Sequence, residues 1–333
     1  MVITRTPYRI SFFGGGTDYP AWFREHGGEV VGTSIDKYCY ISIRELPPFF
    51  EHYHRLVYSK IENVSSIDAI EHPAVREAFR YMDVKVGMEL HHDGDLPARS
   101  GMGSSSSFAV GLLNALYVLK GQYVSPRSLA KQAIHLEQDL IKECVGSQDQ
   151  ILTAIGGLNR VIFRKDGEFS VEPIIMPLGR KMALQSRLLL FYTRVSRFAS
   201  KVAQTQVENF KNQEKQLHKM KSMVRQAIEI LRDDSVPLSQ FGELLHESWL
   251  LKRGLSESVS NEKINQYYDI GRHNGAVGGK ILGAGGGGFL LFFAEPEHHH
   301  HIIGALSELV HVPFKFDSLG TKVSLYDPVQ GGD

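Results

Sequence analysis

Apolar and polar residues follow one another in patterns that predict alternating strands and helices in the first half of the chain. Strands are expected where β-branched and aromatic residues form extended runs, and helices where apolar residues recur every three or four positions. The predicted strands of this half are residues 2–13, 29–44, 85–91 and 158–163. The predicted helices are residues 68–82, 104–120 and 126–143.

The pattern changes near residue 180, where longer polar amphipathic segments begin. A strand is predicted at 188–192, then helices at 200–232, 238–251 and 262–274, a strand–glycine loop–strand unit at 280–294, a helix at 296–309, and strands near 312–316 and 322–326. Both parts mix helices with strands. We therefore predict an α+β protein with two domains, residues 1–180 and 181–333, in line with a prior of roughly 150 residues per domain.

Composition and charge exclude several classes of protein. With 42% hydrophobic and 22% charged residues, the 333-residue chain is typical of a folded protein and unlike a disordered or fibrous one. The 37 Lys and Arg residues balance the 37 Asp and Glu residues, so no global field favours nucleic acid or a membrane. The longest apolar runs are shorter than the ~20 residues of a membrane span. Local geometry must therefore hold any anionic ligand.

The cysteines and histidines add two expectations. Cys39 and Cys144 are far apart and lack CxxC spacing, which indicates neither a disulfide framework nor a zinc site. A reducing cytoplasm fits this best, and the N-terminus has no continuous apolar segment of a signal peptide. The run His298–His301 is interpreted as the solvated first turn of a helix, with a metal site as the alternative.

Glycine is enriched at three places. The 32 glycines are about 10% of the chain, against an average near 7%. They gather at residues 14–16, at 101 and 103, and at 283–288. These are predicted sites of close backbone approach to a ligand, or of turns with positive φ.

The second glycine segment, residues 97–107, leads into the helix 104–120, which is apolar on nearly every side and hence predicted to be buried all round. Unpaired N–H groups and the positive end of the helix dipole make such a junction a phosphate cradle. The hydroxyls of Ser104 to Ser107 add donors and a Mg²⁺ ligand. The segment is neither a Walker A loop nor a GxGxxG motif. A glycine-rich cap without a ligand is the alternative.

Two carboxylates follow. Glu137 has apolar neighbours three and four positions away on both sides, so it is predicted to point inward. It needs a partner there, either an Arg or Lys in a buried ion pair or a Mg²⁺ that bridges phosphates. Asp149 lies at a loop-to-helix junction, where it is either a helix cap or a catalytic group.

The first strand and the last glycine loop complete the set. Alternation places Arg9 on one strand face with Arg5 and Ser11, next to residues 14–18, which indicates a ligand edge; a surface charge is the alternative. The loop within 280–289 has more glycines than a hairpin needs. It is expected to approach either a substrate or the first phosphate cradle.

Together these segments resemble the three signature segments of the GHMP kinase superfamily, in order: Arg5–Asp18, Pro97–Ser107 and Lys280–Phe289. The strings GGGTD at 14–18, EQD at 137–139, VGSQDQ at 145–150 and SWLLKR at 248–253 are most similar to the D-glycero-D-manno-heptose 7-phosphate kinases. Fucokinase domains have a similar pattern. Galactokinases read GEHTD where this chain reads GGGTD, so galactose is disfavoured.

The resemblance implies a fold and a set of roles. The fold would be an N-terminal domain like ribosomal protein S5 domain 2 and a ferredoxin-like C-terminal domain. Asp149 would lie beside the acceptor hydroxyl, while Arg9 would neutralise developing charge and hold Asp149 in its ionised form. Ser105 and Glu137 would be the Mg²⁺ ligands. The ATP phosphates would bind Pro97, Ser100, Gly101, Met102, Gly103, Ser104, Ser105, Ser106 and Ser107.

The acceptor would bind Gly15, Gly16, Thr17, Asp18, Arg197, Gly285 and Gly286. Arg197 is the chosen cation for a substrate phosphate, among Arg194, Arg197, Lys201, Lys252 and Arg253, each of which has a structural role as its alternative.

The implied activity is ATP- and Mg²⁺-dependent phosphorylation of the anomeric hydroxyl of a sugar phosphate, giving the 1,7-bisphosphate from heptose 7-phosphate. The partners would be these small molecules, with no nucleic acid and no membrane, and the oligomeric state is left open. The alternatives are another sugar-1-kinase such as a fucokinase, a non-catalytic ATP- and sugar-binding sensor, and an isoprenoid-type decarboxylase.

Overall fold

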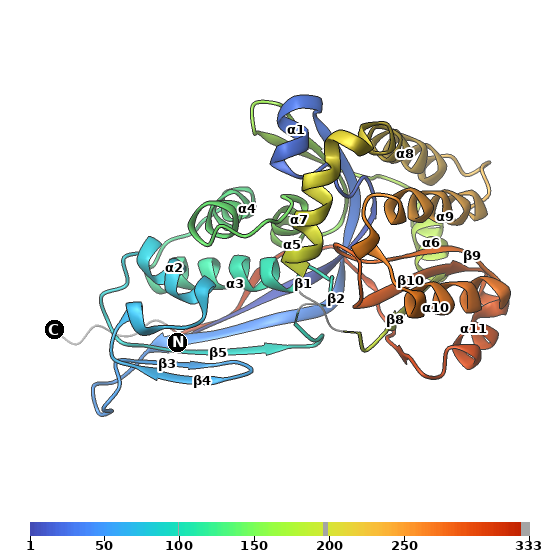
Figure 1. The fold of residues 1–333 in the computed structure, drawn as a ribbon. Coiled ribbons are helices and arrows are strands. Elements are labelled where there is room, and N and C mark those ends of the chain that lie inside the picture. The colour runs from blue at the N-terminus through green and yellow to red at the C-terminus, as the bar shows by residue number, and fades with distance from the viewer. Residues whose placement is uncertain (99, 196–198, 328–333) are drawn as a thin grey trace.

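The chain folds around two β-sheets, each covered by helices (Figure 1). The computed structural model describes residues 1–98, 100–195 and 199–327, with the backbone alone for 199–201. Helices and strands alternate through both parts, which confirms the predicted α+β class. Across the described residues, no helix is both long and apolar enough to cross a membrane.

The larger sheet has nine strands. Its main path runs β13-β1-β2-β5-β3-β4, while β6 and β12 also pair with β2, and β7 pairs with β6. One strand can hold so many partners because β2 is 18 residues long: its first part pairs with β6 and its last part with β5. The bounds are β1 Val2–Phe13, β2 Gly28–Glu45, β3 His54–Val57, β4 Ile61–Val64, β5 Met88–Gly94, β6 Leu158–Phe163, β7 Phe169–Pro173, β12 Phe316–Asp317 and β13 Lys322–Tyr326.

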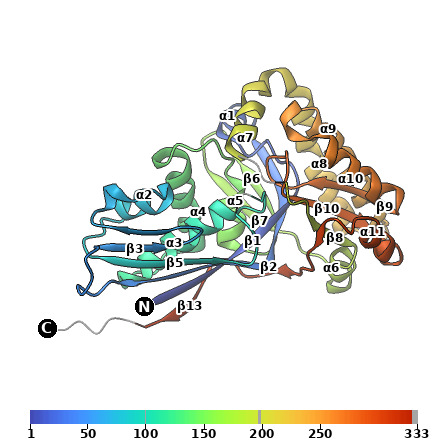
Figure 2. The ribbon, with the colours of Figure 1, turned by 60° about the horizontal axis from the view of Figure 1, so that its bottom comes forward.

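Four helices pack near this sheet: α2 Pro73–Tyr81, α3 Ser104–Leu119, α4 Pro126–His135 and α5 Gln148–Ile155 (Figures 1 and 2). The central one, α3, is buried continuously from Ser106 to Leu116, as its apolar sequence predicts. Its N-terminus follows the second glycine segment. The start of this buried helix therefore lies against β1, where the Ser107 hydroxyl bonds the carbonyl of Pro7.

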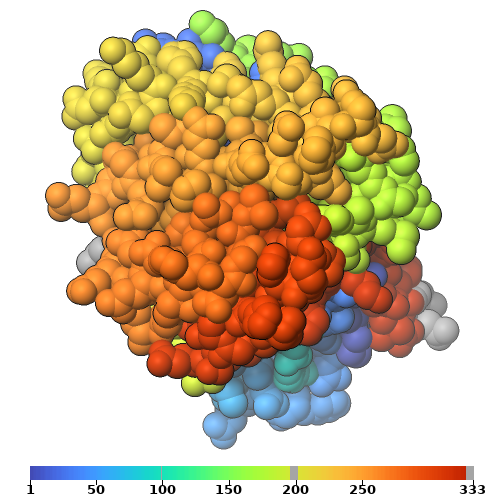
Figure 3. All heavy atoms as spheres, turned by 90° about the vertical axis from the view of Figure 1, so that its right-hand side faces the viewer, coloured from blue at the N-terminus to red at the C-terminus, as the bar shows by residue number. Residues whose placement is uncertain are grey.

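The smaller sheet has the order β11-β8-β10-β9, with bounds β8 Leu188–Tyr192, β9 Ala276–Ile281, β10 Phe289–Ala294 and β11 Val310–His311. Every residue of β10 is buried, as expected for a short, continuously apolar strand. The surrounding helices are α6 Leu178–Gln185, α7 Ala199–Asn209, α8 Glu214–Arg232, α9 Ser239–Arg253, α10 Glu262–His273 and α11 His299–Ala305. Figure 3 shows that α8 to α11, yellow to red, cover most of the face seen there.

Several predicted elements are divided in the structure. The prediction of one helix at 200–232 is wrong, because a 3₁₀ turn at Phe210–Gln213 divides this segment into two helices, α7 and α8. Of the helix predicted at 126–143, the α-helical part ends at His135, and one π-helical turn follows at Leu136–Leu140. The strand predicted near 312–316 is wrong for residues 312–315, which are irregular and separate two short strands on different sheets, β11 and β12. Pro313 lies between them and offers no backbone N–H for a ladder.

Other differences concern short elements and helix ends. The helix predicted at 68–82 starts only at Pro73, a residue suited to the first helical position. The sequence reading missed α6, β3, β4, β7 and a short helix after the first glycine segment, α1 Pro20–His26. The run His298–His301 does open a helix, since a 3₁₀ turn at Pro296–His298 leads directly into α11.

The last strands return to the larger sheet. Residues 316–317 pair with β2, and residues 322–326 pair with β1. Residues from both ends of the chain therefore build this sheet, and the division at residue 180 stays a prediction.

The second and third glycine segments touch each other. Gly283 has φ of +67°, and a Cβ there would lie 2.5 Å from the Cα of Gly101. A Cβ on Gly288, whose φ is +90°, would lie 2.0 Å from the carbonyl oxygen of Ser100. Distances below 3 Å are not tolerated, so only glycine lets these two loops meet. This confirms the expectation that the late loop approaches the predicted phosphate cradle.

Replacement of Gly283 by alanine is therefore expected to destabilise the protein. The added methyl group meets backbone at Gly101, which cannot rotate away, and overpacking of this kind costs about 1–3 kcal/mol. Gly304→Ala is the matched control, because no atom lies within 4 Å of its added Cβ and it is in α11. Urea unfolding measures both variants. Equal midpoints for Gly283→Ala and wild type would contradict the close contact.

Candidate active site

A pocket of about 260 Å³ lies where the three glycine segments meet. Its walls come from the end of β1, the loop after it, the start of α3, the segment before α5, and the loop after β9. The lining includes the predicted residues Arg9, Gly15, Gly16, Asp18, Gly101, Gly103, Ser104, Ser105 and Asp149. Residues as far apart in the sequence as Arg9 and Ala284 thus form one site.

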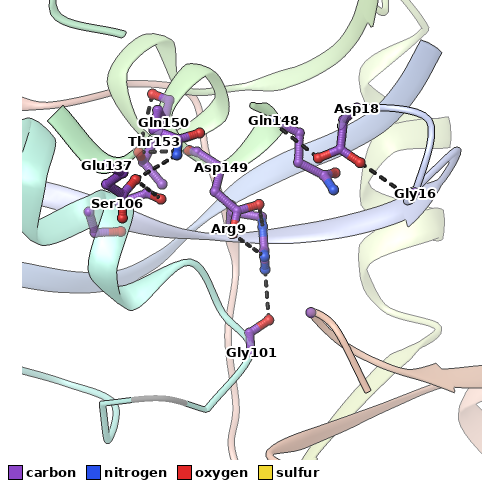
Figure 4. Close-up of polar contacts among 12 residues, drawn as sticks. Arg9, Gly16, Asp18, Gly101, Ser106, Glu137, Gln148, Asp149, Gln150 and Thr153 are labelled. Atoms are coloured by element: carbon purple, nitrogen blue, oxygen red, sulfur yellow. Dashed lines mark hydrogen bonds and ion pairs between the residues drawn. The ribbon is translucent and has the colours of Figure 1, made fainter. Parts of the chain in front are cut away.

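An ion pair joins Arg9 to Asp149 at this pocket (Figure 4). Arg9 donates from Nε to Oδ1 at 2.7 Å and from Nη2 to Oδ2 at 2.5 Å, while Nη1 donates to the carbonyl of Gly101 at 2.8 Å. The arginine side chain is 3% exposed and the aspartate side chain 24%. Such a two-pronged pair fixes the carboxylate plane while leaving part of Asp149 open to the pocket.

Local structure explains the position of both partners. The ladder between β1 and β2 shifts register between Pro7 and Arg9 and again between Ser11 and Phe13. Such bulges re-aim side chains at the edge of a site. Asp149 stands in the first turn of α5, whose N-cap is Ser147. The interpretation of Asp149 as a helix cap is therefore wrong.

Glu137 is buried behind the start of α3, with 1% of its surface exposed. Its Oε2 accepts a hydrogen bond from Ser106 at 2.7 Å and one from Gln150 at 2.5 Å, as Figure 4 shows. Within the described residues Oε1 has no hydrogen-bond partner, and no Arg or Lys pairs with Glu137. The inward orientation is confirmed, and the alternative of a buried ion pair is not found there.

Burial shifts the ionisation of two acids here. It raises the pKa of Glu137 to about 7, against hydrogen bonds that favour the charged form. Burial, with the nearby charge of Asp149, also raises the pKa of Asp18 to about 6. Asp18 accepts hydrogen bonds from the backbone N–H of Gly16 and of Gln148. The site therefore holds carboxyl groups whose charged forms lack full compensation in the protein alone.

A buried lysine adds a cation that the sequence reading did not assign. Lys280 lines the pocket and donates from Nζ to the carbonyl of Phe12 at 2.7 Å. Burial, together with the neighbouring charge of Arg9, lowers its pKa to about 7. Its place at the start of the third glycine segment is the sequence signal that could have found it. Lys252 also lines the pocket, and it donates to the carbonyls of Ile281 and Gly283.

Two unassigned polar residues complete the wall beside Asp18. Ser11 and Gln148 both line the pocket, and both are buried. Within the described residues, the Ser11 hydroxyl and the Gln148 Oε1 atom have no hydrogen-bond partner. Such atoms are positioned to bond a ligand.

Two family descriptions match this chain. Residues 68–157 match the GHMP kinases N terminal domain, and residues 237–311 match the GHMP kinases C terminal domain. The chain belongs to the GHMP kinases. The resemblance seen in the three glycine segments is thereby confirmed, and the chain is a phosphotransferase.

Individual GHMP kinases are similar over most of the chain. A D-glycero-alpha-D-manno-heptose 7-phosphate kinase of Campylobacter jejuni is 28% identical over 295 residues, covering 85% of this chain and 86% of the relative. A bifunctional fucokinase/GDP-fucose pyrophosphorylase of Arabidopsis thaliana is 25% identical over 310 residues, covering 84% of this chain and 28% of the relative.

Solved structures confirm the predicted two-domain GHMP kinase fold. A D-glycero-D-manno-heptose 1-phosphate kinase from Bacteroides thetaiotaomicron superposes with a TM-score of 0.79 at 21% identity, covering 98% of this chain and all of the other. A galactokinase of Lactococcus lactis complexed with galactose gives 0.72 at 16% identity, covering 96% and 94%.

Some residues predicted for the GHMP kinase site lie away from the pocket. The Thr17 hydroxyl bonds the carbonyls of Gly14 and Glu29, and the Ser107 hydroxyl bonds that of Pro7. Pro97 is exposed, Ser100 and Met102 are buried, and Gly285 and Gly286 pack against Val259. Arg197 lies outside the described residues. The described residues of this set are not part of the pocket wall.

Glu137→Gln is expected to make the ligand-free protein more stable than wild type at high pH but not at low pH. The unfolded chain loses the Glu137 proton near pH 4.5 and the folded chain near 7, so wild type loses stability across this range, by about 3 kcal/mol. Glutamine has no such charge. In thermal unfolding at pH 5 and pH 8, the variant should have a higher unfolding temperature than wild type only at pH 8. Glu243→Gln, at an exposed position on α9, is the matched control, and a gain that is equal at both pH values would contradict the shift.

Proposed function

We propose that the chain is an ATP-dependent sugar kinase that phosphorylates the anomeric hydroxyl of D-glycero-D-manno-heptose 7-phosphate, producing the 1,7-bisphosphate. The Arg9–Asp149 pair carries the proposal, since it presents an oriented carboxylate to a pocket bounded by the start of α3. The named heptose 7-phosphate kinase that covers 85% of this chain supports the choice of sugar. The family and the two free cysteines fit action in a reducing cytoplasm.

The ATP phosphates would bind at the start of α3. The helix runs for 16 residues from Ser104, and Gly103 before it has φ of +75°. The first N–H groups of a helix have no partner within the helix, and they attract anions together with the helix dipole. Ser105 is exposed at this point and lines the pocket. Residues 100–107 would thus bind phosphate mainly through backbone and hydroxyl groups.

Mg²⁺ would be held by Glu137 and Ser105. The unpartnered Oε1 atom of Glu137 fits a cation, because a buried carboxylate oxygen without a donor is costly and hard oxygen ligands suit Mg²⁺. When bound, the ion supplies positive charge that neutralises the β- and γ-phosphate oxygens. Ser106 and Gln150 hold the other oxygen and so fix the orientation of the carboxyl group.

Transfer then needs an aligned hydroxyl and a group to take its proton. The anomeric oxygen attacks the γ-phosphorus, the bond from this phosphorus to the β,γ-bridging oxygen breaks, and ADP leaves with that electron pair. Asp149 accepts the hydroxyl proton, and Arg9 holds the Asp149 carboxylate in place and balances charge on the transferred group. Gly15, Gly16 and Asp18 line the pocket at the acceptor side.

The acceptor phosphate would need its own cation. Arg253 stacks over the Trp249 ring, 5.9 Å from its centroid, and is not part of the pocket wall, while Arg194 is exposed. Arg197 remains the proposed contact. Lys252 and Lys280 are the lysines that line the pocket, and both already donate to backbone carbonyls.

A fucokinase-like activity is the second candidate. It is favoured by the similarity to the fucokinase of Arabidopsis thaliana, which extends over 310 residues. Both candidates share the chemistry and differ in the acceptor. A non-catalytic sensor would retain the pocket but show no turnover, and a decarboxylase would release carbon dioxide.

An acceptor panel tests the proposed function. Purified protein with ATP and Mg²⁺ is assayed for ADP formation with heptose 7-phosphate, fucose, mannose and galactose, and carbon dioxide is measured in parallel. Heptose 7-phosphate is expected to give the highest kcat/KM, and ³¹P NMR should show a new anomeric phosphate. Faster turnover of an unphosphorylated hexose would overturn the sugar assignment, and no ADP with any sugar would favour the sensor.

Asp149→Asn is expected to lower kcat about 10²–10⁴-fold, because asparagine keeps the shape but cannot accept the hydroxyl proton. Nucleotide binding, measured by calorimetry, should be retained, which separates lost chemistry from lost folding. Asp68→Asn is the matched control, since Asp68 also pairs with an arginine, Arg80, but on the surface. Turnover of Asp149→Asn within about tenfold of wild type would contradict the proton-acceptor role.

A further inference from the structure

A second cluster of ligating side chains lies away from the pocket, between α1 and α8. His26 is the last residue of α1, and Glu214 and His218 stand one turn apart at the start of α8. One nitrogen of each histidine and one oxygen of the glutamate all lie within 4.8 Å of one another. We propose that His26, Glu214 and His218 bind one Zn²⁺ ion, which joins α1 to α8.

The spacing of the donor atoms fits tetrahedral zinc. Zn–N and Zn–O bonds of about 2.0–2.2 Å in a tetrahedron place neighbouring donors about 3.4 Å apart. The Glu214 Oε1 atom is 3.5 Å from His218 Nε2 and 3.9 Å from His26 Nδ1. Two edges of the triangle are thus within about half an ångström of zinc geometry, and no two donor atoms of the cluster are more than 4.8 Å apart.

The donor set selects the kind of ion. Two imidazoles and one carboxylate suit zinc and similar transition metals, whereas Mg²⁺ and Ca²⁺ prefer oxygen ligands. His218 and Glu214 are half-exposed, with 50% and 54% of their side chains accessible, so an ion can enter and water can take the fourth position. This site is therefore different in chemistry from the carboxylate and hydroxyl pair proposed for Mg²⁺.

Neighbouring groups hold the two histidine rings in place. The Trp22 ring stacks on His26 at 4.1 Å between centroids and meets His218 edge-on at 5.0 Å. The other nitrogen of His26, Nε2, faces the carboxylate of Glu25 at 3.7 Å. This distance is too long for a hydrogen bond, but rotation of the exposed Glu25 side chain would let it act as the outer partner of a zinc-bound histidine. Lys221 of α8 also donates to the carbonyl of His26, which ties the two helices together at the cluster.

The site adjoins the acceptor segment through one residue. Leu217 precedes His218, and its Cδ2 atom lies 3.0 Å from where a Cβ on Gly16 would be. An ion that fixes α8 against α1 would therefore also fix the wall beside residues 14–18. The binding proposal itself does not depend on the proposed kinase reaction.

Zinc binding to the chelator-treated, nucleotide-free chain tests the proposal. The background variant carries His300→Asn and His301→Asn, because these exposed histidines, with rings 3.8 Å apart, could bind zinc by themselves. Equilibrium dialysis should find one Zn²⁺ per chain, and zinc should raise the unfolding temperature. Co²⁺ in place of zinc should give the strong visible absorption of a tetrahedral complex.

Variants of the ligands assign the ion to this cluster. His218→Ala and Glu214→Gln are each expected to weaken zinc binding about 100-fold or more, because loss of a ligand costs more than loss of an outer partner. His273→Ala, an exposed histidine at the end of α10, is the matched control and should bind as the background does. Zinc affinity and Co²⁺ spectra unchanged in both ligand variants, or no zinc bound by the background, would overturn the proposal. Either result leaves the kinase assay unaffected.

Discussion

Burial of charge around one pocket is the constraint on which the site depends. Glu137, Asp18 and Lys280 are all nearly inaccessible to solvent. Burial raises the pKa of the two acids and lowers the pKa of the lysine, so it favours the neutral form of each group. A folded protein keeps such groups only where something else requires them, because an unpaired buried charge is costly. A ligand that brings cations to the acids and anions to the lysine would recover this free energy. Such a ligand would therefore stabilise the folded protein, which supports the proposed binding of a metal–nucleotide complex.

Glycine makes this arrangement possible in the backbone. The segments after β1, before α3 and after β9 approach closely enough that several side chains would collide with main chain, as at Gly283 with Gly101 and at Gly288 with Ser100. These contacts bring carbonyl and N–H groups, not bulky side chains, to the pocket edge. The bulges in β1 add to this, because they direct Arg9 toward the start of α3, where its backbone N–H also bonds the carbonyl of Met102. The close approach of these segments therefore depends on positions where the chain lacks a Cβ atom.

The sequence predicts some of this and misses the rest for physical reasons. The inward orientation of Glu137 could be predicted, because its apolar neighbours at helical spacing report which face is buried, even though the local turn is a π-helix. The burial of α3 follows from its composition in the same way. Periodicity carries no information about contacts between distant segments, so the pairing of Arg9 with Asp149, 140 positions apart, needed the structure or the family resemblance. The helix α1 was missed because seven residues give too little periodicity. The break between α7 and α8 was missed because Phe210–Gln213 contains no Gly or Pro that would mark the end of a helix.

The glycines at residues 14–16, in the segment proposed to bind the acceptor, also affect how much space the pocket offers. Galactokinases carry Glu and His where this chain has Gly15 and Gly16. A Cβ on Gly15 would come no closer than 3.8 Å to Gln148 and 3.9 Å to Ser11, so Gly15 leaves space in the pocket, whereas a Cβ on Gly16, at a φ of +100°, would lie 3.0 Å from Leu217. That space is bordered by the unpartnered hydroxyl of Ser11 and the unpartnered Oε1 of Gln148, with Asp18 beside them, among the residues described. A larger sugar with more hydroxyl groups would both fill this volume and satisfy these polar atoms. This pocket wall is therefore compatible with the proposed seven-carbon acceptor.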